Sequence, residues 1–97
     1  MMNDRILVEL NDLRQAHKQI GQLAELLERN EQYVQQQLAR LQDWVGISAD
    51  EMKQRLSKFQ SELVMRRRFL TERQQELLRY IQDMERADQS AASARWM

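Results

Sequence analysis

A single short interruption near the middle of the chain separates two long helical patterns. Trp44 ends the first pattern, and Gly46 supplies the backbone freedom on which a helix can end. Ser48 and Glu51 then fit a capping box, with the Ser48 side chain as the cap of a new helix and Glu51 as its third residue. A helix end, a tight turn and a new helix start so close together predict a helix–turn–helix hairpin.

The residues before this turn repeat apolar side chains at alternating spacings of four and three. Such a heptad pattern predicts one long helix, expected over about residues 3–43, whose apolar side packs against another helix. Ten of the twelve positions are apolar, and His17 and Glu31 are the polar breaks: Ile6, Leu10, Leu13, His17, Ile20, Ala24, Leu27, Glu31, Val34, Leu38, Leu41 and Val45. A flanking apolar stripe favours a bundle helix over one strand of a two-stranded coiled coil. That stripe comprises Leu23, Leu26, Tyr33 and Trp44.

The residues after the turn predict a second helix from about 49 to 87. Its expected apolar side follows the same alternation, with Arg66 and Arg73 as polar breaks: Met52, Leu56, Phe59, Leu63, Arg66, Leu70, Arg73, Leu77, Tyr80, Met84 and Ala87. Four further apolar residues widen this surface: Val64, Phe69, Leu78 and Ile81. The predicted hairpin domain therefore spans residues 1–88, with its turn at 44–48.

Folding the chain about residue 47 predicts which polar residues meet inside the hairpin. Arg66 would lie near Glu28 and Glu31, and one of these glutamates would neutralise it. Arg73 would lie near Gly21. A glycine in mid-helix costs about 1 kcal/mol relative to alanine, so we expect Gly21 to make room for the Arg73 side chain.

The last nine residues lose the helical periodicity. Residues 89–97 are small and polar and end in Arg95, Trp96 and Met97, which predicts a frayed or disordered tail. An incidental terminal tryptophan is the simpler interpretation of Trp96. The alternative is an anchor for a partner, because tryptophan is enriched at binding hot spots.

Two helices of this length leave apolar stripes in contact with water unless something covers them. The simplest solution is pairing with a second hairpin into a four-helix bundle. The expected core and interface comprises Leu27, Val34, Leu38, Leu41, Leu56, Phe59, Leu63, Leu70 and Leu77. The sequence predicts an all-α dimer and leaves open whether the second hairpin is identical.

Composition and charge argue against several function classes. The chain carries 15 basic and 15 acidic residues, so its net charge of zero gives no reason to expect nucleic acid or an anionic membrane as partner. No apolar run approaches the roughly 20 residues that span a bilayer. Polar residues at positions 3–5 also interrupt the start, so no Sec-type signal peptide is expected. The one basic run, residues 66–68, fans around a helix and is flanked by Glu62 and Glu72.

No arrangement of side chains points to catalysis. The chain has no cysteine, which excludes disulfides and thiolate metal sites. Its single histidine, His17, lies on the apolar side of the first helix, where a polar break sets the register of packing. The carboxylates alternate with basic residues at helical spacing, the pattern of a solvated face. We therefore expect no enzyme activity, no metal and no cofactor.

The position of the turn gives the chain a family resemblance. Trp44-Val45-Gly46, between two helices of about 40 residues, resembles the WXG family of ESAT-like helical hairpins exported by type VII secretion systems. Phe59 lies where that family often has a large apolar residue. The segment from Met84 to Asp88 falls where the family's export motif Y-x-x-x-[D/E] closes the second helix. Asp88 matches the acidic position, whereas Met84 replaces the tyrosine.

The resemblance implies a route and partners. In the family, the W-x-G of one chain lies beside the export motif of its partner, and a hexameric FtsK/SpoIIIE-like ATPase reads the tail. The chain would be made in the cytoplasm and secreted or placed on the cell surface. Its partner would be itself, a second small hairpin, or the N-terminal helical domain of a larger effector. With Met84 in the tyrosine position, the chain either depends on that partner or tolerates methionine, which fills apolar space without donating a hydrogen bond.

A second function remains open on the residues alone. The second helix is rich in arginine and glutamine. This composition is compatible with an intracellular coiled-coil adaptor, or with a chaperone subunit of another secretion or assembly machine. In that case the placement of the W-x-G tripeptide would be a coincidence.

Overall fold

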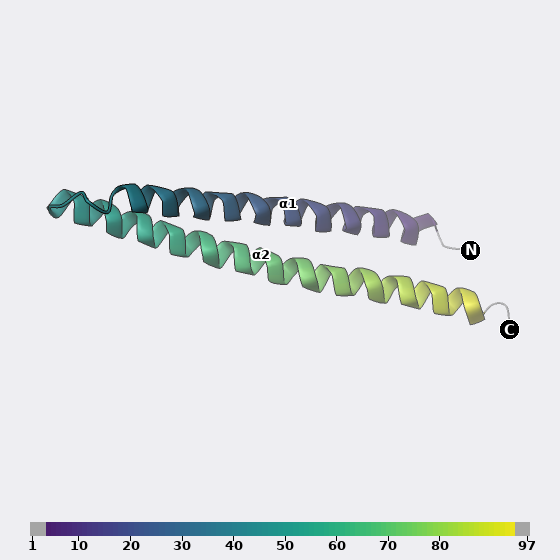
Figure 1. Ribbon diagram of the computed structural model, residues 1–97. Coiled ribbons are helices and arrows are strands. Elements are labelled where there is room, and N and C mark those ends of the chain that lie inside the picture. Colours follow the sequence, from purple (N-terminus) through teal and green to yellow (C-terminus); the bar gives the residue numbers. More distant parts are fainter. Residues whose placement is uncertain (1–3, 95–97) are drawn as a thin grey trace.

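Two long helices joined by a short turn make up the fold. The computed structural model describes residues 4–94, with helix α1 at Asp4–Arg40 and helix α2 at Ile47–Ala94. The helices run side by side in opposite directions and form a rod of 77 × 15 × 15 Å (Figure 1). The predicted all-α hairpin is therefore confirmed.

Helix α1 turns its heptad positions toward α2. The positions from Ile6 to Leu41 are all buried or half-buried, and the most enclosed apolar residues among them are Leu10 and Val34. Val45 differs, because α1 ends at Arg40 and Val45 lies in the turn with 81% of its surface exposed.

Helix α2 turns a different side toward α1 than its apolar residues indicate. Five expected residues do lie on the inner side: Leu56, Leu63, Leu70, Leu77 and Met84. The inner positions between them each fall one residue after the expected ones and are Lys53, Gln60, Arg67, Gln74, Ile81 and Asp88. The residues expected there are exposed instead: Met52, Phe59, Arg66, Arg73, Tyr80 and Ala87. Consecutive residues lie about 100° apart around a helix. Because every second inner position moves by one residue, the side of α2 that faces α1 is turned by about 50° from the expected side.

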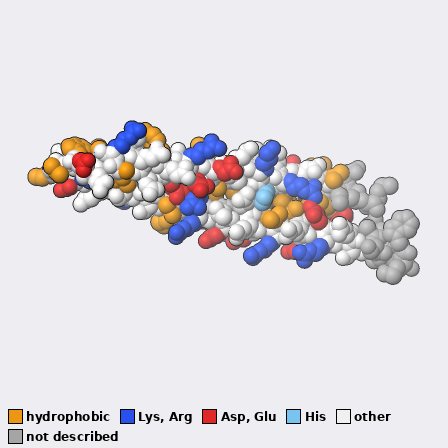
Figure 2. Space-filling model, viewed as in Figure 1, with side chains coloured by type: hydrophobic (Ala, Val, Ile, Leu, Met, Phe, Trp, Pro, Cys, Tyr) orange, Lys and Arg blue, Asp and Glu red, His pale blue; other side chains and the backbone are white. Residues whose placement is uncertain are grey.

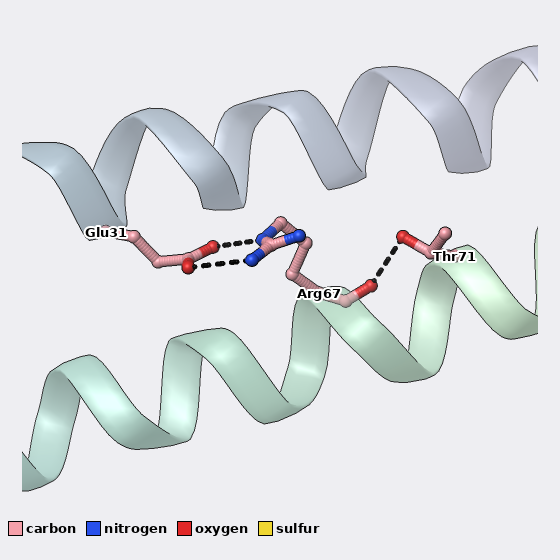
Figure 3. A network of polar contacts seen from close by, with 3 residues as sticks. All are labelled: Glu31, Arg67 and Thr71. Atoms are coloured by element: carbon pink, nitrogen blue, oxygen red, sulfur yellow. Dashed lines mark hydrogen bonds and ion pairs between the residues drawn. The ribbon is translucent and has the colours of Figure 1, made fainter.

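The polar inner residues of α2 have partners on α1, which explains the rotation. Arg67 donates two hydrogen bonds to the Glu31 carboxylate, from Nε at 2.5 Å and from Nη2 at 3.2 Å (Figure 3). The predicted neutralisation of Arg66 is therefore wrong by one residue. Glu31 is only 9% exposed, so the bidentate pair satisfies a carboxylate that would otherwise be costly to bury.

Gly21 makes room for Gln74 and not for Arg73, a second displacement by one residue. A Cβ atom on Gly21 would lie 2.6 Å from the Gln74 side-chain nitrogen. That nitrogen donates a long hydrogen bond of 3.4 Å to the backbone oxygen of His17. The inner side of the hairpin thus places paired polar residues between its leucine layers, which favours one register of the two helices.

The turn begins the second helix earlier than the predicted capping box. Gly46 has a positive φ of 119°, and its carbonyl accepts a hydrogen bond from Asp50 N at 3.0 Å. Gly46 is therefore the cap, and Ser48 is already inside the helix. The side chains of Ser48 and Glu51 make no hydrogen bond to any described residue.

The end of α2 also differs from the expected boundary. The helix continues to Ala94, so residues 89–94, expected in the tail, are helical. Alanine is the best helix former, and neither glycine nor proline interrupts this stretch. Arg95 and Trp96 lie outside the described residues. No stretch of either helix, within residues 4–94, has the length and hydrophobicity of a membrane span.

Candidate functional site

An apolar groove lies between the helices near the middle of the rod. It encloses about 520 Å³ and is lined by Leu23 and Leu27 of α1 and by Met65, Arg66, Phe69 and Leu70 of α2. Its walls are almost entirely hydrocarbon, apart from the guanidinium of Arg66. A groove of this composition suits an apolar side chain of a partner.

A second groove lies at the turn. It encloses about 220 Å³, and Trp44 forms one wall while Met52 and Arg55 of α2 form another, with Ser48 and Glu51 completing the lining. Trp44 is 43% exposed and Met52 is 42% exposed. The tryptophan thus stands in a groove and not in the core.

The two grooves lie on the same face of the hairpin. The inner positions of α2 repeat every seven residues along its length, so residues separated by multiples of seven share a side. Met52 of the second groove and Arg66 of the first are fourteen residues apart, with Phe59 midway between them. The two helices therefore present one continuous surface that runs from the turn past the middle of the rod.

We call this surface the aromatic face. Nine exposed large apolar residues define it: Leu23, Leu26, Tyr33, Trp44, Met52, Phe59, Met65, Phe69 and Tyr80. They include every Phe, Trp and Tyr side chain within the part of the chain that the structure describes. Figure 2 shows hydrophobic side chains open to solvent at the turn end, on the left of the view. An exposed apolar stripe of this extent is typical of a protein–protein interface.

The opposite face of the hairpin is more polar. Arg14 of α1 forms an ion pair with Glu85 of α2 across it. Leu7 and Leu78 are exposed apolar residues here, but no described Phe, Trp or Tyr side chain accompanies them. The aromatic face is therefore better suited than the opposite face to contact with another protein.

Two arginines lie on the aromatic face beside its central groove. Arg73 stacks over the Phe69 ring, with 4.8 Å from the guanidinium carbon to the ring centroid, and its Nη1 is 2.7 Å from the Glu76 carboxylate. Arg66 makes no ion pair with any described residue. The middle of the face therefore combines an apolar floor with cations at its edge.

The turn itself forms an ordered apolar tip at one end of the rod. The Lys53 ammonium donates to the carbonyl of Trp44 at 2.6 Å and to that of Gln42 at 3.4 Å. Both carbonyls belong to the turn that follows α1. A cation just beyond the C-terminal end of a helix is also attracted to the negative end of the helix dipole. Val45 and Ile47 stand beside Trp44 and are 81% and 82% exposed.

Sequence reasoning missed Lys53 as part of the turn. Its spacing marks it only as a polar residue after Met52, and its reach to the end of α1 depends on the path of the chain through Gly46. The sequence offers one signal of this role: Lys53 lies within the first two turns of the second helix, close to the expected end of the first helix.

The expected export-motif residues lie elsewhere on the rod. Met84 and Asp88 are half-buried inner residues of α2 that face α1. About 37 residues of helix separate Met84 from the start of α2, which is roughly 55 Å at 1.5 Å per residue. Within one chain, therefore, these residues are far from the W-x-G turn.

No group of His, Cys, Asp and Glu in the described part of the chain could hold a metal ion. His17 is half-buried on the inner side of α1, where its backbone oxygen accepts the Gln74 hydrogen bond. The hydrogen bond from Arg67 to the Glu31 carboxylate raises the pKa of Arg67 above its ordinary value, which favours the charged guanidinium.

Comparisons of the chain with known protein families, with curated proteins and with solved structures find no match.

Proposed function

We propose that this chain is a non-enzymatic export partner in type VII secretion and that it works as a helical-hairpin dimer of the WXG kind. The observation that carries the proposal is the exposed Trp44-Val45-Gly46 tip, which Lys53 holds in place at the end of a long rod. A tip of this kind offers a secretion machine a preformed apolar surface that needs little ordering on binding.

The aromatic face supports the dimer within this proposal. A hairpin that buries one side of each helix and exposes a second apolar side is half of a four-helix bundle. The partner is a second hairpin, either the same chain or a related one, or the N-terminal helical domain of an effector. Covering the face would remove five aromatic side chains from water, which is favourable in proportion to the apolar area buried.

The export signal in this proposal is shared between two chains. Trp44 and Gly46 provide one half, and Met84 with Asp88 of the partner chain provides a degenerate second half. An FtsK/SpoIIIE-like ATPase would read this composite end together with the last residues of the chain. The chain would leave the cytoplasm by this route and reach the cell surface or the medium.

An export assay tests the role of the turn. Tagged chains would be expressed in a host that has a type VII system, and the chain in the medium would be measured against the chain in the cells. We expect Trp44→Ala to abolish export while circular dichroism shows an unchanged helical content. Val45→Ala is the matched control, because Val45 is more exposed than Trp44 and occupies the unspecified middle position of the motif. Equal export of both variants would refute the proposal.

A coiled-coil adaptor of another assembly machine is the alternative function. The observation that favours it is the length of α2, which has 48 residues against 37 in α1 and so extends the rod beyond the paired part. Neighbouring genes distinguish the two. An FtsK-like ATPase or an LXG-type toxin gene supports export, whereas rotary-ATPase or needle-complex genes support the adaptor.

A further inference from the structure

Helix α2 has two sides that could face α1, and both sides contain the same leucines. These shared residues are Leu56, Leu63, Leu70 and Leu77. The two sides differ only in the residues between the leucines. The observed inner side adds Lys53, Gln60, Arg67, Gln74, Ile81 and Asp88. The other side adds Met52, Phe59, Arg66, Arg73, Tyr80 and Ala87.

The observed packing leaves the more apolar of these two sides in solvent. Of the six residues that distinguish the inner side, only Ile81 is apolar. On the other side four of the six are apolar, and Phe59 and Tyr80 are both exposed. Burial of apolar surface would by itself favour the opposite choice. A specific polar contact is therefore needed to hold the polar side of α2 against α1.

The ion pair between Arg67 and Glu31 is such a contact. Among the described residues it is the most enclosed contact between charged groups of the two helices, with side chains that are 32% and 11% exposed. Both hydrogen bonds of the guanidinium end on the same carboxylate (Figure 3). An enclosed carboxylate that has lost its cation is strongly unfavourable. Any packing of α2 that keeps Glu31 enclosed and ionised must therefore bring a cation to it.

Arg66 is a second cation that can reach Glu31. It is the chain neighbour of Arg67, so it lies only about 1.5 Å away along the helix axis and about 100° around it. It makes no ion pair with any described residue, and its side chain lies at the edge of the central groove. Turning α2 about its own axis by roughly 50° would exchange Arg67 for Arg66 beside Glu31.

The rest of the hairpin can accommodate the same turn of α2. The shared leucines stay inside, and Phe59 and Tyr80 move from solvent toward α1. Gly21 carries no side chain, so it leaves room for whichever of Gln74 and Arg73 faces it. One sequence thus has two packings that keep the leucine layers and supply a cation to the same carboxylate, which is the basis of a two-state element.

We infer that Arg67 is a positioning residue whose bond to Glu31 fixes the rotation of α2 that presents the aromatic face. Without this bond, α2 turns by roughly 50°, Arg66 takes over Glu31, and Phe59 and Tyr80 turn inward. The inference rests on the proposed function only for the use of the aromatic face. The packing itself depends neither on export nor on a partner.

The second packing removes part of the aromatic face from the surface. A partner that covers this face binds only the observed packing, so its binding shifts the population toward that packing. In a chain with a weakened Arg67 contact, the apparent affinity falls in proportion to the fraction of chains that present the face. Arg67 thus controls association from inside the hairpin, without touching the partner.

Thiol labelling reports which side of α2 faces α1, since the chain has no native cysteine. Gln60→Cys places a thiol on the inner side of α2, and Ala87→Cys places one on the other side. Each is labelled with iodoacetamide at a dilution where the solution mass is that of one chain, because labelling rates follow the accessibility of the thiol. With Arg67 present, we expect Ala87→Cys to react several-fold faster than Gln60→Cys.

Arg67→Gln should reverse this order. The thiol of Gln60→Cys leaves the interior and that of Ala87→Cys enters it, while circular dichroism shows that the helical content is retained. Arg66→Gln is the matched control, because it makes the same charge change one residue away and leaves the observed pair intact. Its labelling order should be that of the wild type. E31R/R67E should keep this order too, since it restores the pair with exchanged charges and repels Arg66.

A purely structural role for Arg67 predicts a different result. Loss of the pair would then lower the stability of the observed packing without changing which thiol reacts faster. An unchanged labelling order in Arg67→Gln would therefore overturn the inference. A reversed order in Arg66→Gln would overturn it as well.

Urea unfolding covers the case in which Arg67→Gln folds poorly. If either arginine can serve Glu31, Arg66→Gln should leave the unfolding midpoint nearly unchanged. The double variant R66Q/R67Q should then lower the midpoint by more than the two single variants together, because neighbouring residues that share one partner are not additive. Additive losses, or Arg67→Gln as unstable as the double variant, would show that Arg66 does not replace Arg67 and would contradict the inference.

Solution mass connects the positioning role to association. Arg67→Gln should give the mass of one chain at a concentration where the wild type gives twice that mass, and pairing as tight as in the wild type would count against the role. The labelling order and the urea midpoints need neither a partner nor a secretion system. Failure of the positioning role is therefore distinguishable from failure of the proposed dimer or of export.

Discussion

The neighbouring residues Tyr80 and Ile81 separate the two sides of α2 most sharply. Ile81 is 4% exposed and packs against α1, whereas Tyr80 is 56% exposed on the aromatic face. Replacing a buried isoleucine by alanine costs about 2–5 kcal/mol. A two-helix core is thin and can relax around a cavity, so we expect Ile81→Ala to lower the free energy of unfolding by about 2–3 kcal/mol. Replacing isoleucine or tyrosine by alanine gains a similar amount of helix propensity. This gain therefore cancels when Ile81→Ala is compared with Tyr80→Ala.

The Tyr80→Ala variant should behave differently because its side chain lies outside the hairpin core. For the isolated chain we expect a loss below about 1 kcal/mol, in the usual range for exposed sites. At concentrations where the dimer forms, the loss should grow, since dimerisation contributes to apparent stability by mass action.

Urea unfolding followed by circular dichroism, at low and at high protein concentration, gives the measurement. Ile81→Ala should lower the midpoint at every concentration, and Tyr80→Ala mainly at high concentration. If Tyr80→Ala costs as much as Ile81→Ala in dilute protein, Tyr80 packs inside the hairpin and the rotation of α2 described above is refuted.

Three further predictions concern Gly21, Lys53 and Arg67. Gly21→Ala should stabilise the hairpin by about 0.5 kcal/mol in urea unfolding, because the gain in helix propensity exceeds the cost of moving the flexible end of Gln74. In a Gln74→Ala background the gain should approach about 1 kcal/mol, and a net loss in both backgrounds would contradict this. Lys53→Met should cost about 0.5–1 kcal/mol by removing the donor from the carbonyls of Gln42 and Trp44 in the turn after α1, with faster amide exchange in the turn; unchanged exchange would argue against this role of Lys53. The raised pKa of Arg67 means that the stability from its pair with Glu31 is fully present below the pKa of the unfolded chain and is lost only as pH rises through the still higher folded value. Arg67→Leu should therefore change the unfolding free energy equally at pH 7 and pH 9, and a difference that shrinks at pH 9 would be evidence against the assignment.

The first helix could be predicted well because its apolar residues leave little choice. From Ile6 to Leu41, one stripe holds nearly all the regularly spaced apolar side chains, and this stripe lies against α2. The second helix has two candidate sides that share its leucines. One adds apolar residues such as Phe59 and Tyr80, and the other adds polar residues such as Arg67.

Hydrophobicity alone selects the wrong side of α2 for contact with α1. The polar side packs inward because its members find partners there, with Glu31 opposite Arg67 and Gly21 beside Gln74. Such pairings depend on the alignment of two helices, which the periodicity of each helix does not fix. The apolar side then stays outside, and it becomes the candidate interaction surface.

The turn, too, could be predicted only in part, because some of its contacts depend on the path of the chain. The Trp44-Val45-Gly46 stretch correctly places the change of direction, because glycine readily adopts the positive φ found at Gly46. The predicted capping box at Ser48 does not form, because α2 already begins at Ile47 with Gly46 as its cap. The contact of Lys53 with the end of α1 depends on that path, so it could not be predicted from spacing.

The solution mass of the purified chain tests the central claim, that the hairpin pairs through its aromatic face. Light scattering should give twice the chain mass of 11.7 kDa for the wild type. Phe69→Arg, which places a charge in the central groove of the aromatic face, should give the mass of one chain with little loss of helical content. A helical wild-type protein that keeps the mass of a single chain at high concentration would contradict the account.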